Sequence, residues 1–118
     1  MSIERVETNR RMSQAVRADA TVYIAGQLAY ENRGGDVATQ TGEILRRIER
    51  LLANFGGDKT CLVSATVWLA DIADYDRINA VWDAWVPDGY APARACVEAK
   101  LAMTGYLVEI AAVAVVTK

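Results

Sequence analysis

The sequence predicts an α+β fold in which two helices lie on one face of a mostly antiparallel sheet. Short β-prone segments alternate with helical ones, and two segments in the middle of the chain repeat apolar residues at helical spacing. The chain has 118 residues, of which 53% are hydrophobic, so it is long enough to bury one core. We therefore expect a single domain over residues 1–118.

The N-terminal half predicts a β-hairpin and then a long amphipathic helix. Ser13 to Asp19 and Thr21 to Gln27 are rich in β-branched and aromatic residues and form the expected hairpin. Asp36 stands at the N-cap of a helix expected from Val37 to Phe55, which Gly56-Gly57 ends. Charged residues on the other face of this helix are expected to be solvated: Glu43, Arg46, Arg47, Glu49 and Arg50.

The C-terminal half predicts one strand, a second helix and two further strands. The strands are expected at Cys61 to Leu69, Ala93 to Ala99 and Leu107 to Val116. The helix runs from Asp74 or Tyr75 to about Val86, where Pro87 and Gly89 follow. The expected order is two strands, or three if a further strand is present, and then helix, strand, helix and two strands. Aromatic residues on the second helix are interpreted as core or subunit interface: Tyr75, Trp82 and Trp85.

Composition excludes several classes of function. The formal net charge is −2 and the basic residues are scattered, so neither nucleic acid nor an anionic membrane is an expected partner. No apolar run reaches the length of a membrane span and the N-terminus does not resemble a signal peptide, which predicts a cytoplasmic protein. The chain has no histidine, which excludes Ser-His-Asp and Cys-His catalysis and histidine-ligated zinc. Cys61 and Cys96 are interpreted as reduced, buried thiols.

One charged block interrupts the apolar C-terminal part of the chain. Pro92-Ala93-Arg94-Ala95-Cys96-Val97-Glu98 precedes the run from Tyr106 to Val116, inside which Glu109 stands. A buried arginine is costly unless an anion meets it, so Arg94 needs a partner. That partner is Glu109, Glu98 or the carboxylate of a substrate, and the residues alone leave all three open.

These residues resemble the RidA/YjgF family of reactive-intermediate deaminases, in a divergent branch. The resemblance rests on the order of elements and on four motifs: Ala25-Gly26-Gln27, Arg77-Ile78-Asn79-Ala80-Val81-Trp82, the block around Arg94, and Val108-Glu109-Ile110. It implies a chorismate-mutase-like α+β fold assembled as a homotrimer, with equivalent clefts between neighbouring subunits.

The resemblance also implies roles for single residues. Arg94 would bind the carboxylate of a small 2-imino or 2-enamino acid, and Glu109 would position the water that attacks the imine carbon. Cys96, Gly26 and Asn79 match further positions of the cleft. Hydrolysis of an imine to a 2-keto acid and ammonia needs a held carboxylate, a placed water and proton transfers, so we expect no metal and no cofactor.

Two positions depart from the family pattern and make the expected cleft more apolar. Met12 stands where characterised imine deaminases carry an aromatic hydroxyl, and Ala25 where they carry a serine. We expect both Met12 and Ala25 to contact the substrate. They weigh against activity on the smallest imino acid.

The same residues also allow other interpretations. Arg94 and Glu109 could be structural partners, Cys96 a packed thiol, and Asn79 a capping or packing group. For the whole protein, one alternative is a non-catalytic binder of small carboxylates or a stress-related interaction protein of the same fold. Another is chorismate-mutase-type chemistry in an analogous cleft, which fold analogy alone favours.

Overall fold

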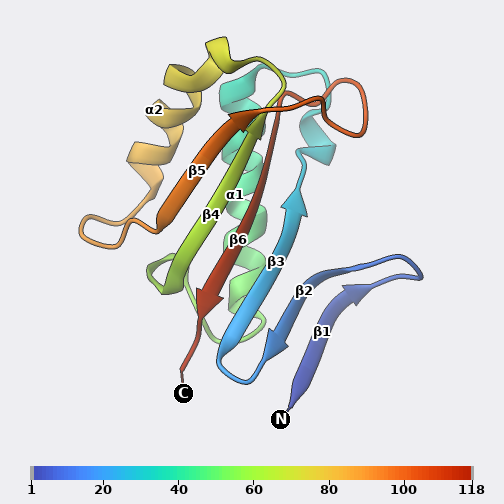
Figure 1. The fold of residues 1–118 in the computed structure, drawn as a ribbon, viewed down its shortest axis with the longest axis vertical. Helices are drawn as coiled ribbons and strands as arrows, with labels where there is room; N and C mark the ends of the chain where they lie inside the picture. The colour runs from blue at the N-terminus through green and yellow to red at the C-terminus, as the bar shows by residue number, and fades with distance from the viewer. Residues whose placement is uncertain (1, 118) are drawn as a thin grey trace.

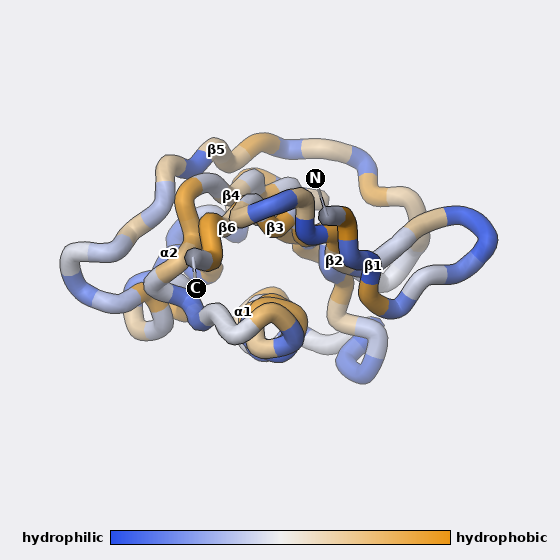
Figure 2. The backbone as a smooth tube through the Cα atoms, turned by 90° about the horizontal axis from the view of Figure 1, so that it is seen from below, coloured by the Kyte–Doolittle hydropathy of each residue, from blue (hydrophilic) through white to orange (hydrophobic). Residues whose placement is uncertain are grey.

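The computed structural model describes residues 2–117, so the expected domain bounds extend one residue beyond it at each end. A six-stranded sheet in the order β1-β2-β3-β6-β4-β5 carries both helices on one face (Figures 1 and 2). The strands are β1 (Ile3–Thr8), β2 (Ser13–Ala18), β3 (Thr21–Gln27), β4 (Leu62–Leu69), β5 (Ala93–Glu98) and β6 (Val108–Val115), and the helices are α1 (Val37–Ala53) and α2 (Tyr75–Trp85). The predicted α+β class is confirmed.

The structure determines two features of the sheet that the sequence prediction left open. Its third N-terminal strand, β1, is an edge strand whose residues are exposed except for the partly covered Val6, so it has no buried face to give it an apolar pattern. Four of the strand pairs are antiparallel, whereas β4 and β5 pair in parallel because α2 connects them as a crossover.

Helix α1 begins where the sequence predicts and ends two residues earlier. The side chain of Asp36 accepts a hydrogen bond of 2.8 Å from the backbone N–H of Thr39, as an N-cap does. At the other end Gly56 has φ of 76°, and the N–H of Gly57 donates to the carbonyl of Leu52 at 3.0 Å. Phe55 therefore packs from the turn that follows the helix.

The core lies between the sheet and the apolar face of α1. Ile44, Leu45 and Ile48 of the helix are each at most 1% exposed, and they belong to one cluster with β-strand residues such as Val22 and Ile110. This burial is the main favourable contribution to the stability of the fold.

One charged residue of α1 does not lie in solvent as expected. Glu43 is only 4% exposed, and its carboxylate accepts hydrogen bonds from the Asn32 side chain at 2.8 Å and from Arg47 Nε at 2.6 Å. These bonds replace the water that the carboxylate loses. They hold the short helix that contains Asn32 (η1, Tyr30–Asn32) against α1.

Gln40 fixes the segment that leads into β6. Its side chain is fully buried, and Nε2 donates to the carbonyls of Gly35 and Gly105 at 3.1 and 3.0 Å. Its Oε1 accepts from the N–H of Leu107 at 2.8 Å. The long connection between β5 and β6, which runs along the top edge of Figure 1, is thereby held just before Glu109.

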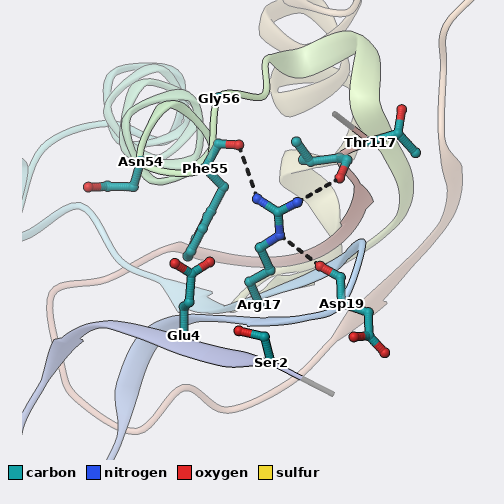
Figure 3. A pocket seen from close by; sticks show the side chains of 9 residues that line it. Ser2, Glu4, Arg17, Asp19, Asn54, Phe55, Gly56 and Thr117 are labelled. Carbon is teal, nitrogen blue, oxygen red and sulfur yellow. Dashed lines mark hydrogen bonds between the residues drawn. The ribbon is translucent and has the colours of Figure 1, made fainter.

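A cavity of about 700 Å³ lies at the opposite end of β3 and β6, and Arg17 is one of the residues that line it (Figure 3). The guanidinium donates to the backbone carbonyls of Asp19, Phe55 and Val116, at 2.7, 3.5 and 3.2 Å. These bonds tie β2 to the end of α1 and to the C-terminal strand. The donors of Arg17 are thus used in holding the fold together.

Within residues 2–117, neither helix combines the length and the hydropathy that a membrane-spanning helix requires.

Candidate functional site

Arg94 lies on β5 and points toward the helix layer. Its Cα partner on β4 is Ala65, a core residue, so the Arg94 side chain extends on the side of the sheet that α2 covers. Nη2 donates to Oδ1 of Asn79 at 2.8 Å. Nη1 is buried, and it has no hydrogen-bond partner among the described residues. Arg94 therefore holds one buried donor ready for an acceptor that residues 2–117 do not supply.

Two aromatic rings of α2 also contact this guanidinium. Its Cζ lies 5.0 Å from the ring centroid of Trp82 and 5.9 Å from that of Tyr75, both within the range of a cation–π interaction. Trp82 is buried, whereas Tyr75 is 42% exposed, so of the two interpretations of Tyr75, core or subunit interface, the core is excluded. Tyr75, Asn79 and Trp82 are four and three residues apart and share one helix face. The sequence contained this spacing, but the two aromatic residues were interpreted as core or subunit interface and not as contacts of Arg94.

Cys96 follows Arg94 on the same side of β5. The thiol is free and half-buried, as is that of Cys61, so the two cysteines are less covered than expected. Burial raises the pKa of the Cys96 thiol, and the charge of Arg94 offsets only part of this rise. The thiol is therefore protonated at neutral pH, which does not suit a nucleophile.

Glu109 lies on the opposite face of the sheet, which no helix covers. It pairs in register with Trp68 between the core residues Val108 and Ile110, so the alternation of β6 turns it to the open face. Burial raises the pKa of its half-buried carboxyl group. The carboxylate lies directly over Gly26, where any Cβ would overlap its Oε2 and lie 2.9 Å from its Cδ.

Gly26 reaches this position through a β-bulge in β3. The register with β6 shifts between Ile24 and Gln27, so Ala25 and Gly26 are the irregular residues. The buried side chain of Gln27 stabilises the bulge, because Nε2 donates to the carbonyl of Ala25 and to Oε1 of Gln14, both at 2.9 Å.

Met12 belongs to the same end of the sheet as Gly26. It ends the turn between β1 and β2, where Asn9 Oδ1 accepts from the N–H groups of Arg11 and Met12. Its side chain is 40% exposed. The turn projects from the side of the molecule in Figure 1.

The expected site residues thus form two clusters that do not meet within one chain. We call Arg94, Asn79 and Cys96 the arginine cluster, and Glu109, Gly26, Ala25 and Met12 the glutamate cluster. Arg94 is two strands and three residues away from Glu109, which separates their Cα atoms by roughly 14 Å, and the side chains leave opposite faces.

The expected structural pairs of Arg94 are not formed. Among residues 2–117 it makes no salt bridge with Glu109 or with Glu98. Glu98 instead accepts a hydrogen bond from the N–H of Ile72 at 2.9 Å. No group of three or more His, Cys, Asp or Glu residues in the described part of the chain is arranged to hold a metal ion.

The close approach of the Glu109 carboxylate to Gly26 predicts what a methyl group added at position 26 would do to the Glu109 side chain. We expect Gly26→Ala to turn the Glu109 side chain away while the fold is kept, because the new Cβ occupies the place of the carboxylate. A crystal structure of the variant measures this displacement. Gly42→Ala in α1 is the control, because a Cβ there meets only the end of Arg46 at 3.4 Å. An unmoved Glu109 carboxylate in Gly26→Ala would contradict the geometry.

The raised pKa of Glu109 predicts a change of stability with pH. Folding favours its protonated form, so the charged form costs stability above the folded pKa, and this cost disappears as the pH falls toward the ordinary value of 4.5 and below. Glu109→Gln should therefore be more stable than the wild type at neutral pH, and the difference should vanish near about pH 4.

Urea unfolding at fixed protein concentration measures both differences. Glu31→Gln, at an exposed carboxylate, is the control. A Glu109→Gln variant that is less stable than the wild type at neutral pH would show that the folded protein stabilises the charged carboxylate, and would contradict this prediction.

Comparisons with known proteins agree with this architecture. Residues 2–116 match the sequence family described as Endoribonuclease L-PSP. The RutC family protein YoaB of Escherichia coli (strain K12) is 39% identical over 116 residues, which cover 98% of this chain and 100% of that protein. The 2-iminobutanoate/2-iminopropanoate deaminase of Bos taurus is 39% identical over 108 residues, which cover 87% of this chain and 78% of that one.

A solved structure of a YjgF family member from Neisseria meningitidis extends the likeness to three dimensions. It superimposes with a TM-score of 0.95 at 41% identity, covering 100% of this chain and 98% of that chain. The similarity in sequence and in fold therefore spans the whole described domain. The chain belongs to the RidA/YjgF family.

Proposed function

We propose that the protein hydrolyses small reactive 2-imino and 2-enamino acids to 2-keto acids and ammonia, in a cleft between two subunits. The observation that carries this proposal is the separation of the arginine cluster from the glutamate cluster, each with one unused functional group. Relatives named as deaminases support the choice of reaction. The two clusters can act on one substrate only if different copies of the chain supply them.

Arg94 is the carboxylate-binding group of the proposed site. Its planar guanidinium can hold a carboxylate through two parallel charge-assisted hydrogen bonds, which fixes the direction of the neighbouring imine carbon. The buried, unpartnered Nη1 supports this role, because a buried donor without an acceptor is unfavourable until a ligand supplies one.

Glu109 positions and activates the attacking water. The imine reacts with its nitrogen protonated: the carboxylate takes a proton from the water as the water oxygen bonds to the imine carbon, and the nitrogen becomes a neutral amine. The proton is then returned to that nitrogen and the C–N bond breaks. As the C=O bond of the keto acid forms, the hydroxyl proton passes through the carboxylate to the leaving ammonia. A carboxyl group whose pKa is raised by burial suits both transfers better than an ordinary one.

The assembly we propose is the homotrimer implied by the family resemblance. The open sheet face is apolar over much of its width, and three of its residues, Tyr23, Val97 and Val115, are each at least 40% exposed. Exposed apolar surface of this kind favours contact with a second protein surface. A neighbouring copy would cover it and bring its own arginine cluster toward Glu109.

The substrate we propose carries an apolar side chain. Met12 and Ala25, which replace polar groups of the family pattern, belong to the glutamate cluster, and Met12 offers an exposed apolar surface. Although the matching family is described as an endoribonuclease, nucleic acid is not the substrate we propose, because the net charge of −2 does not favour a phosphate backbone.

Replacing Arg94 tests the proposed function. Arg94→Ala should release ammonia at least about a hundredfold more slowly from imino acids formed in situ by an amino acid oxidase, because the carboxylate is no longer oriented. Sedimentation checks that the assembly persists. Arg77→Ala removes an exposed arginine from α2 and should keep wild-type rates. Wild-type turnover in Arg94→Ala would overturn the proposal.

The same variants separate the alternatives. A non-catalytic binder would show thermal stabilisation by 2-keto acids that Arg94→Ala loses, with no ammonia released by the wild type. Conversion of chorismate to prephenate by the wild type would favour mutase chemistry instead.

A further inference from the structure

We propose that Trp82 and Asn79 are positioning residues that hold the Arg94 guanidinium in the orientation in which it binds the substrate carboxylate. This inference rests on the proposed function and deepens it. It changes the role of Asn79 from a substrate contact to a partner of the arginine. It also assigns a function to an aromatic residue that sequence patterns place in the core.

The contacts leave Arg94 little freedom on its helix side. The Oδ1 atom of Asn79 takes one Nη2 donor at 2.8 Å, and the Trp82 ring lies 5.0 Å from Cζ. A ring that stacks on the guanidinium restricts its tilt, and a hydrogen bond in its plane restricts its rotation. Together they fix the direction of the remaining N–H groups, including those of the unpartnered Nη1.

The rigid support for this arrangement is the helix itself. Asn79 and Trp82 are three residues apart on α2, so their side chains project from adjacent turns of one face. Trp82 is 6% exposed and packs in the core, which makes it a fixed platform. Tyr75, the first residue of α2, lies on the same face and is 42% exposed. Its ring centroid is farther from the Cζ atom of Arg94, at 5.9 Å.

A purely structural alternative is that the cluster only ties the edge strand β5 to α2. Both interpretations predict that substitutions lower stability. Only the positioning role predicts that loss of the ring at position 82 lowers the affinity for the carboxylate and that a different aromatic ring there restores it. The experiment must therefore measure affinity and turnover in variants that remain folded.

The variants form matched pairs. Trp82→Leu removes the ring and keeps an apolar side chain, and Trp82→Phe keeps a ring. Asn79→Ala removes the acceptor, and Asn79→Asp replaces it with a charged group that competes with the substrate carboxylate for Arg94. Trp85→Leu is the control, because Trp85 is an indole on the same helix that packs on Trp82 and bonds to Glu49.

We expect Trp82→Leu and Asn79→Ala to lower kcat/KM by about tenfold or more and to raise the inhibition constant of 2-oxobutanoate by a similar factor. Asn79→Asp should raise that constant most. Trp82→Phe and Trp85→Leu should stay within about threefold of the wild type. Unchanged constants in Trp82→Leu and Asn79→Ala, or equal losses in Trp85→Leu, would overturn the inference.

Two further measurements separate this inference from the proposed function. Calorimetric binding of 2-oxobutanoate tests the positioning role without any turnover, so a wild type that binds but releases no ammonia would refute only the deaminase proposal. NMR of the Arg94 guanidinium, assigned with Arg94→Lys, should show slow rotation about the Nε–Cζ bond in the wild type and faster rotation in Trp82→Leu. Equal rotation in both proteins, or no binding by the wild type, would refute the positioning role.

Discussion

The alternation of side chains along β5 and β6 is the constraint on which the rest of the structure depends. Successive side chains of a strand point to opposite faces of the sheet, and the hydrogen-bonded register determines which residues point to which face. Ala65 opposite Arg94 and Trp68 opposite Glu109 fix the two faces. One chain therefore presents its guanidinium to the helix layer and its carboxylate to the open side of the sheet.

The surroundings of the partly buried charge differ between the two faces of the sheet. On the helix side, aromatic rings and a neutral amide stabilise Arg94 without neutralising it, so the positive charge remains available to an anion. On the open side, no arginine among residues 2–117 pairs with Glu109, and burial raises the pKa of its carboxyl group. A salt bridge within the chain would have stabilised both groups and removed both from chemistry.

Much of this could be predicted from the sequence, because the information was local. Helical spacing and an N-cap predicted α1, β-branched and aromatic residues predicted β3, and an apolar run predicted β6. Strand β1 could not be placed, since an edge strand that buries almost nothing leaves no apolar pattern. The contact between the Trp82 ring and Arg94 was missed for a related reason: an apolar stripe has the same spacing whether its rings face other apolar groups or a guanidinium.

The structure places the candidate residues in two separate sets, a grouping that the sequence did not show. Arg94, Asn79 and Cys96 assemble, and so do Gly26 and Glu109, yet the separation of the two sets depends on strand register, which a single sequence does not reveal. The bulge at Ala25 and Gly26 is a second long-range feature. It is held by a buried glutamine on β3 that bonds to a neighbouring strand.

In the proposed assembly each site needs residues from two chains, and subunit mixing is the direct test of this arrangement. Arg94→Ala and Glu109→Gln chains, refolded together in equal amounts, should recover about a quarter of wild-type activity, since each site takes one cluster from each of two neighbours in a ring. Wild type mixed with the double variant should also give about a quarter. No recovery in the first mixture, and about half of the activity in the second, would mean that each chain carries a complete site and would contradict the account.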